Sequence, residues 1–394
     1  MTEVEDTSAD TDVSVADAEP DVGGSACAAI FDPGLNFDID FTGEKTQIHA
    51  DAVFDGEFVW LVYNSRGANG ENFDLWMVQI SCGASPVARP QLVADSGNGI
   101  IIEPQIARGG DGTLLVVWQL DDQSGSDNLS LWSRAYDTDA SPIADGSRLP
   151  LFREGEANLG NAWMAALEPR AGGFALAGAW AHPEAERFQV FAQSLDPSGR
   201  PIGDAIDLEL EPTTTQVFPA LAVGDSDVAV MWERQPDEGE AELRGARVDL
   251  ASGSVSQLQT FAESAGAAVA FDGQGYVWAG SVGGDIQVWS DGGEVLAELG
   301  TSAVDVAPVF ARSIAGTELG VVWYRQQSGS RFDVATHVQP VGEPWEDSVG
   351  RVLSIGETAA PYSPVIVPID GGWFYAWSGG TSPLFEIRAR FESE

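Results

Sequence analysis

The chain has 394 residues, 44% of them hydrophobic, and a net charge of −42. So negative a chain repels phosphate backbones and anionic lipid, which excludes nucleic acid and membrane surfaces as expected partners and leaves cationic ligands, calcium and neutral sugars. No stretch approaches the roughly 18 consecutive apolar residues of a membrane-spanning helix, so we expect no transmembrane segment.

The chain begins with a strongly acidic segment. Residues 1–22 carry eight acidic residues, no basic residue and no aromatic residue, and such a composition cannot bury enough apolar surface to fold. We therefore interpret residues 1–26 as a disordered acidic linker and residues 27–394 as one folded domain. Acidic tails of this kind follow a signal or a lipid anchor in bacterial surface proteins. We thus expect a secreted, periplasmic or cell-surface protein whose leader is not part of this chain.

From residue 48 onward, one sequence pattern recurs along the chain. It consists of a Pro-led strand, a Gly turn, an apolar strand that ends in an aromatic anchor, a polar loop, an alternating strand and a further turn and strand. The clearest copies have their anchors at Trp118, Trp232, Trp323 and Trp377, and weaker copies place Tyr63, Trp180 and Ser281 at the same position. Seven repeats of four strands, without helical periodicity, predict an all-β fold, a seven-bladed β-propeller with four-stranded blades.

The two ends of the repeat array complete each other. The last repeat reaches only its third strand before the chain stops, whereas residues 36–41, with the alternating sequence NFDIDF, precede the first repeat and belong to none. We predict that this segment pairs beside residues 385–392 as an N-terminal latch strand, because closure would leave no exposed sheet edge.

The chain has two cysteines, Cys27 and Cys82. In a propeller, Cys82 lies in the turn after the third strand of the first blade, and Cys27 approaches the latch strand from the same face. We predict a disulfide between them, which the chain-entropy model values at about 4 kcal/mol. Two unpaired thiols are the alternative.

The repeat unit resembles repeats in large secreted proteins of Gram-negative bacteria. The resemblance rests on residues 104–118, 134–137, 195–203 and 219–232, with the pattern P-x-(I/L)-A…G-D-G…V-V-W. It implies blades and export but no particular activity, since such repeats serve as scaffolds in unrelated proteins. The Trp-Asp dipeptide, the sialidase box and the D-x-D-x-D-G calcium loop of other propellers are all absent from the sequence.

The loops that follow the anchors and the loops that lead into the first strands share the face of the channel mouth, where we expect a ligand. The predicted binding residues are Asn64, Arg66, Glu103, His182, Arg234, Tyr324 and Arg325, and His49 and Trp163 lie in the leading loops. The alternative is a solvated rim in which the arginines pair with nearby acids. The turns after the third strands are short, as at residues 196–199, so few side chains are expected to converge there.

Three functions fit these observations. A binding module would take a carbohydrate or a protein at the mouth, with aromatic rings stacking on the ligand and Arg and Asn fixing its polar groups. A polysaccharide lyase would use His182 or Tyr324 as the base, while Arg234 and Arg325 neutralise a uronate carboxylate. A structural scaffold would need neither. We favour the binding module, as a monomer; no cofactor is expected, and calcium would bind without a recognisable motif.

Overall fold

The structure, a computed structural model, is an all-β protein. It describes residues 36–39, 46–66, 72–83, 85–87, 89–121, 129–143, 147–149, 161–182, 184–185, 187–263, 265–300, 304–328, 331–357, 364–381 and 384–393. No helix occurs in these ranges, so none of them contains a helical segment that could cross a membrane.

The described residues form seven antiparallel sheets. Each sheet is one blade, which confirms the predicted seven-bladed propeller. The first four blades are β2 (Gln47–Phe54), β3 (Phe58–Arg66), β4 (Phe73–Ser81) with β5 (Ser85–Pro86) and β6 (Gln91–Ala94); β7 (Ile100–Arg108), β8 (Leu114–Asp121), β9 (Leu129–Tyr136) and β10 (Ser147–Arg148); β11 (Ala162–Arg170), β12 (Gly173–His182), β13 (Arg187–Leu195) and β14 (Pro201–Asp207); and β15 (Thr214–Val223), β16 (Val228–Pro236), β17 (Glu242–Asp249) and β18 (Ser254–Glu263).

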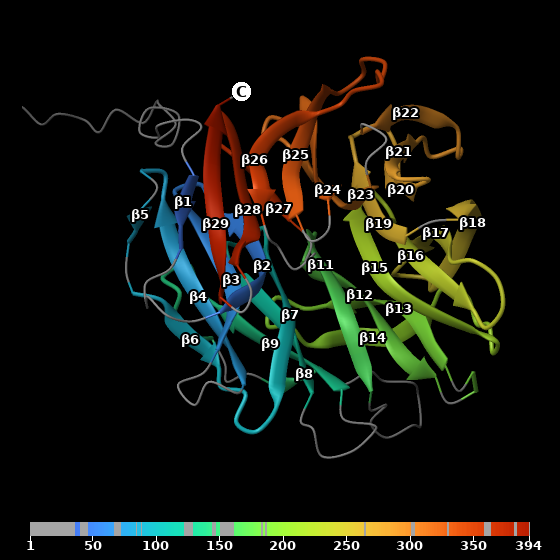
Figure 1. Cartoon of the computed structure of the whole chain (residues 1–394). Helices are drawn as coiled ribbons and strands as arrows, with labels where there is room; N and C mark the ends of the chain where they lie inside the picture. The colour runs from blue at the N-terminus through green and yellow to red at the C-terminus, as the bar shows by residue number, and fades with distance from the viewer. Residues whose placement is uncertain are drawn as a thin grey trace, which may run out of the picture.

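The remaining three blades follow the same order from the inner to the outer strand. They are β19 (Ala265–Phe271), β20 (Tyr276–Val282), β21 (Asp285–Trp289) and β22 (Val295–Leu299); β23 (Val304–Arg312), β24 (Glu318–Ser328), β25 (Arg331–Pro340) and β26 (Arg351–Glu357); and β27 (Val365–Ile369), β28 (Gly372–Thr381), β29 (Leu384–Ser393) and β1 (Asn36–Asp38). The inner strands β2, β7, β11, β15, β19, β23 and β27 each contact the next, and β27 contacts β2, so the blades close into a ring (Figure 1).

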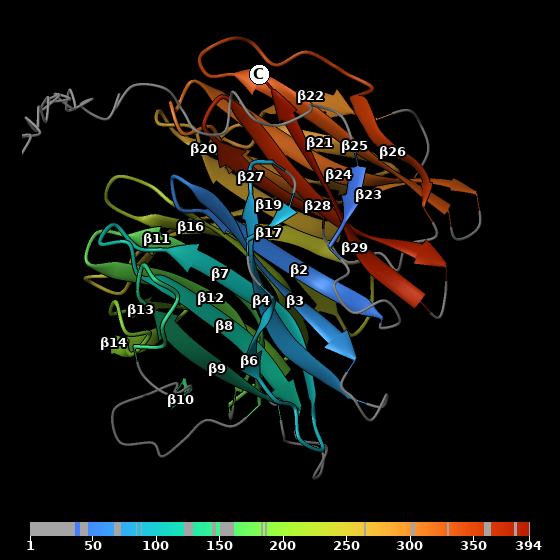
Figure 2. The same ribbon diagram turned by 90° about the vertical axis from the view of Figure 1, so that its left-hand side faces the viewer.

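The N-terminal latch is present as predicted. Strand β1 supplies the outer strand of the last blade by pairing antiparallel with β29, with Phe37 opposite Ala389. The Ile39 N–H continues the pairing by donating to the Ile387 carbonyl oxygen at 2.9 Å. Figure 2 shows the red strands of the last blade beside the blue strands β2 and β3 of the first. Residues 40 and 41 of the predicted strand lie outside the described residues.

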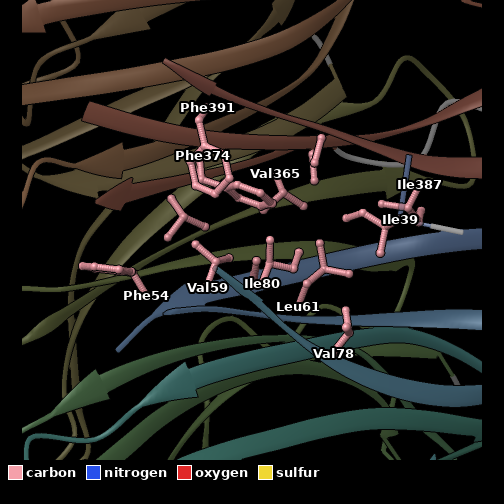
Figure 3. Close-up of a cluster of buried hydrophobic side chains, with 14 of the residues drawn as sticks. Ile39, Phe54, Val59, Leu61, Val78, Ile80, Val365, Phe374, Ile387 and Phe391 are labelled. Carbon is pink, nitrogen blue, oxygen red and sulfur yellow. The ribbon is translucent and has the colours of Figure 1, made fainter. Parts of the chain in front are cut away.

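The junction between the last and the first blade is filled by apolar side chains from both. Figure 3 shows Val365, Phe374 and Phe391 of the last blade facing Val59, Leu61 and Ile80 of the first, with Ile39 of the latch at one side. All seven side chains are buried, so the closure is a hydrophobic core like those between the other blades and is stabilised by the same burial of apolar surface.

The anchor positions are correct in five blades and shifted in two. Tyr63, Trp118, Trp232, Trp323 and Trp377 are all buried. In the third blade, however, the strand pairing places Gly178 at the anchor position, two residues before Trp180. In the fifth blade Gly280 holds that position, one residue before Ser281. The glycines are required because a Cβ atom would lie 2.8 Å from the ring of Phe191 at Gly178 and 2.1 Å from Leu243 at Gly280.

Two predictions concern residues that the structure does not describe. The acidic linker at 1–26 lies outside the described residues, as does Cys27. Cys82 lies in the turn after β4 and is buried, with its Sγ 3.7 Å from the Glu57 carbonyl oxygen. The domain division and the Cys27–Cys82 disulfide therefore stay predictions.

Candidate functional site

His182, the predicted lyase base, lies in the interior of the protein. Its side chain is 1% exposed, with its ring edge-on to that of Trp180 at 4.6 Å. Its Nε2 is 3.6 Å from the carboxylate of Asp207 on the outer strand β14, and its Nδ1 accepts the Glu184 N–H. His182 therefore joins the second strand of its blade to the outer strand and does not face the channel mouth.

The two predicted arginines are both engaged with acids. The Arg325 side chain, 5% exposed, places its Nε 3.1 Å from the buried carboxylate of Asp305 and donates through Nη2 to the Val349 carbonyl oxygen. Arg234 pairs with Glu211 at 2.5 Å and with Glu242 at 3.3 Å. The predicted arrangement, in which both guanidinium groups stand open at the mouth, is not found.

The other predicted residues are dispersed. Tyr324 is fully buried, with its ring edge-on to Phe332 at 6.0 Å. Trp163 packs on Phe188 with ring centroids 4.9 Å apart. Arg66 is exposed at the end of β3, with its guanidinium carbon 5.8 Å from the centre of the Phe73 ring. Because His182 and Tyr324 are buried and Arg234 and Arg325 are paired with acids, the structure does not present the predicted lyase residues together at one opening.

A repeated β-bulge surrounds the channel at its mouth. In six inner strands the pairing with the second strand shifts beside the anchor. The bulged residue has a positive φ in every case, between 46° and 75°. These residues are His49, Glu103, Met164, Phe218, Gly266 and Ala307. They occupy equivalent positions in successive blades of a closed ring, so we call them the bulge ring.

In the second and fourth blades, the residue after the anchor connects its blade to the bulge of the next. The Gln119 Oε1 accepts the Met164 N–H at 3.4 Å, and the Glu233 Oε1 accepts the Gly266 N–H at 2.8 Å. Asn64 holds the same place in the first blade, next to the bulge of Glu103. Its side chain is fully buried, and neither its Oδ1 nor its Nδ2 has a hydrogen-bond partner among the described residues. An unsatisfied amide of this kind is costly and marks a site where a ligand or water would be stabilised.

Phe218 is the exposed aromatic residue of the bulge ring. Its side chain is 45% exposed, although its φ is +52°. A bulky residue in this conformation is strained by an amount on the order of 1 kcal/mol, and such strain concentrates at functional sites. The small residues Gly266 and Ala307 follow it round the ring.

Carboxyl groups with raised pKa values line the same channel. Burial raises the pKa of Asp51 to about 7, although its Oδ2 accepts the Ile106 N–H at 2.8 Å. Burial and, secondly, the charge of Asp51 raise the pKa of Glu168 to about 8. Asp51 lies on β2 and Glu168 on β11, the inner strands that contact β7 from either side.

Two titratable members of the bulge ring are also perturbed by burial. The pKa of Glu103 is raised to about 7, and its Oε2 is buried without a hydrogen-bond partner. The pKa of His49 is lowered to about 4, so its imidazole is neutral at pH 7. Perturbed groups gathered in a channel are typical of functional sites. Within the described residues no group of three His, Cys, Asp or Glu side chains has the geometry of a metal site.

No family model and no curated protein matches this chain. Among solved structures it is similar to a protein of unknown function from Dyadobacter fermentans, with a TM-score of 0.59 and 10% identity over 92% of this chain and 99% of that one. It is also similar to a Penicillium chrysogenum α-L-arabinanase complexed with arabinobiose (TM-score 0.52, 13% identity, 76% and 94% covered). A Fusarium graminearum α-L-arabinofuranosidase gives a TM-score of 0.50 at 12% identity, with 80% and 97% covered. At these identities the likeness shows the fold alone.

Sequence reasoning did not single out Phe218, Asp51 or Glu168. A signal for Phe218 was present, because it precedes the strand-opening Pro219 just as Glu103 precedes Pro104. The residue before such a proline is the one that bulges toward the mouth. No comparable signal marks Asp51 and Glu168 in the sequence. They differ from the many other acids only in being buried when the blades close into a ring.

Proposed function

We propose that this protein is an extracellular or cell-surface propeller that binds a neutral carbohydrate at the bulge ring. The observation that carries the proposal is the combination, in one bulge ring, of an exposed, strained aromatic ring at Phe218 with the partly exposed carboxyl group of Glu103, whose pKa is raised. Sugars present an apolar C–H face, which stacks on aromatic rings, and hydroxyl groups, which need both donors and acceptors.

The protonation of the site favours a neutral ligand. With pKa values of about 7, the carboxyls of Glu103 and Asp51 are partly protonated at neutral pH. A protonated carboxyl group offers a hydroxyl donor and a carbonyl acceptor, which suit the hydroxyl groups of a sugar. The net charge of −42 disfavours uronates and sulfated glycans, and the arginines predicted to offset it are paired elsewhere. One protein of similar fold is an arabinanase complexed with arabinobiose, so a neutral sugar on this architecture has a precedent.

Hydrolysis of a glycan is the second candidate, because Asp51 and Glu168 are close enough to interact. Glycoside hydrolysis uses two carboxyl groups in different states, one protonated and one ionised. Both pKa values here are raised to about 7 and about 8, so neither group is held ionised at neutral pH. This favours binding over hydrolysis.

An array of neutral and uronate-containing oligosaccharides tests the proposal, with arabinobiose as a defined probe for calorimetry. We expect retention of neutral glycans only. Phe218→Ala should weaken that binding about tenfold, the effect of losing one stacking contact of roughly 1–1.5 kcal/mol. Glu103→Gln, which imitates the protonated carboxyl group, should retain binding at pH 8 where Glu103→Ala does not. Trp345→Ala, on the opposite face, is the matched aromatic control.

Failure of the array to retain any neutral glycan would overturn the proposal. The same conclusion would follow if Phe218→Ala and Glu103→Ala both bound as tightly as the parent. Release of reducing sugar from a bound glycan, lost in Glu168→Gln, would instead favour hydrolysis.

A further inference from the structure

The connection between β25 and β26 in the sixth blade is long and lies on the face opposite the channel mouth. It comprises residues 341–350, whereas the connection between β17 and β18 comprises only residues 250–253. The expectation that all turns after the third strands are short is therefore wrong for this blade. The segment docks on the fifth blade, where Ser348 forms a parallel bridge with Leu299 and the Asp347 Oδ1 accepts the Glu298 N–H at 2.9 Å.

A groove of about 480 Å³ lies between this segment and the fifth blade. Its floor is apolar and is formed by Val277, Leu296 and Leu319. The half-exposed ring of Trp345 forms part of one wall, next to Pro344. The floor therefore suits a hydrocarbon chain, and the indole offers an aromatic surface beside it.

The wall of the groove is fixed before any ligand arrives. The buried Gln339 donates through its Nε2 to the carbonyl oxygens of Pro340, Glu343 and Pro344 at 3.2–3.3 Å. The Trp345 ring packs edge-on to Phe310, with centroids 6.4 Å apart. Binding to a wall ordered in this way costs little conformational entropy.

All charged residues that line the groove are acidic. They are Asp272, Asp291 and Glu343. Asp272 uses its Oδ1 to accept the N–H groups of its own turn. Asp291 shares its Oδ2 with Arg247 at 3.1 Å, whereas its Oδ1 is buried and has no hydrogen-bond partner. The carboxylates of Asp272 and Glu343 therefore make the groove negatively charged, with the Asp291–Arg247 ion pair beside them.

We propose that this groove binds the side chain of a basic residue, arginine or lysine, presented by a partner protein. The methylene stem would lie on the apolar floor, and the cationic head would stack on Trp345 and pair with the acids. An anionic ligand would be repelled by the carboxylates of Asp272 and Glu343. This site is independent of the bulge ring and of the carbohydrate proposed there.

Titration of the full chain with Nα-acetyl-arginine amide and Nα-acetyl-lysine amide, followed by NMR and calorimetry, tests the proposal. We expect saturable binding that weakens with added salt, and none with Nα-acetyl-glutamate amide. Trp345→Ala should weaken binding about fivefold to tenfold, as expected for the loss of a cation–π contact. Glu343→Gln should weaken it as well, whereas Glu346→Gln, on the same segment but outside the groove, should not.

Crossed variants separate this proposal from the carbohydrate site. Phe218→Ala should leave arginine binding unchanged, and Trp345→Ala should leave glycan binding unchanged. Binding of the arginine probe that survives Trp345→Ala together with Glu343→Gln would overturn the proposal, as would the absence of any binding by the parent. A neutral disaccharide that perturbs the Trp345 indole signal where arginine does not would replace it with a second sugar site.

Discussion

Asp51 and Glu168 are acids whose environment opposes ionisation. Their folded-state pKa values of about 7 and about 8 lie above the ordinary values of 3.8 and 4.5. The folded state therefore binds more protons than the unfolded state between about pH 4 and pH 8, and its free energy of unfolding falls as the pH rises through that window. The two carboxyl groups therefore destabilise the folded state at neutral and alkaline pH.

Replacing either carboxyl group should remove part of this pH dependence. We expect Asp51→Asn and Glu168→Gln to match the parent in free energy of unfolding at pH 4 and to exceed it at pH 8.5 by at least about 1 kcal/mol, the equivalent of one pKa unit. Urea denaturation at the two pH values measures the difference. The exposed charges are the same in all three proteins. If the free energy of unfolding changed equally with pH in the parent and both variants, the two carboxyl groups would not be the cause of the pH dependence.

Phe218 allows backbone strain and function to be separated. Its φ of +52° is a conformation that glycine adopts without penalty, and its side chain is 45% exposed. We expect Phe218→Gly to keep or raise the free energy of unfolding by up to about 1 kcal/mol while weakening glycan binding about tenfold, as Phe218→Ala does. Loss of more than about 2 kcal/mol on urea denaturation would instead assign Phe218 to the core.

The sequence could not show which acids would pair with the arginines and the histidine of the predicted site. Arg325 pairs with Asp305, twenty residues earlier on the neighbouring strand, and with the Val349 carbonyl oxygen in the long sixth-blade segment. His182 is held by Asp207 of the outer strand. Each partner lies beyond the local pattern, and with so many acids in the chain the sequence does not indicate which one pairs with which arginine. Glu103 and His49 both lie in the bulge ring, and their role in binding stays a prediction.

At the scale of the strands, the repeat pattern predicted nearly all the pairings. Proline spacing and buried aromatic anchors are local, so they identify the first two strands of each blade. The anchors of the third and fifth blades were predicted wrongly because glycine holds the anchor position in both. The sequence pattern predicted the nearby residues Trp180 and Ser281 instead. The structural cause is the space taken by Phe191 and Leu243, which a single sequence does not display.

A tryptophan at the fifth-blade anchor position tests this account. In Gly280→Trp the indole would enter the volume held by Leu243, whose Cδ1 lies 2.1 Å from the Cβ position. Overpacking a filled core costs about 1–3 kcal/mol, so we expect a lower melting temperature. Gly292→Ala, whose Cβ would be 3.7 Å from its nearest neighbour, is the control and should leave the melting temperature unchanged. If the Gly280→Trp protein were as stable as the parent, position 280 could hold an aromatic anchor, and the steric explanation for its glycine would be wrong.

At the scale of the molecule, the closed ring makes the two chain ends interdependent. The predicted Cys27–Cys82 disulfide would reinforce that closure. We expect a thiol reagent to label no cysteine in the denatured, non-reduced protein and two after reduction, and we expect reduction to lower the free energy of unfolding by a few kcal/mol, up to about 4. Two labelled thiols before reduction would refute the bridge.

Strand β1 is the element on which closure depends, and removing it provides the sharpest test of the architecture. A chain that begins at Thr46 lacks β1 and Ile39, so the Phe37–Phe391 ring contact at 5.8 Å is lost and the backbone of β29 becomes an unpaired edge. Loss of the buried Ile39 side chain alone costs about 1.5–3 kcal/mol. We therefore expect a lower melting temperature by calorimetry and, because open edges pair with one another, association that increases with concentration in light scattering.

A second truncation supplies the control for that experiment. A chain that begins at Asn36 keeps β1 but lacks Cys27, so under reducing conditions it should match the parent in melting temperature and remain monomeric. The point variant Ile39→Asp keeps the full length and buries a charge in the closing core, so it should reproduce the instability of the longer truncation. If the chain that begins at Thr46 were as stable and as monomeric as the one that begins at Asn36, the last blade would be complete with three strands, and β1 would contribute nothing to closure.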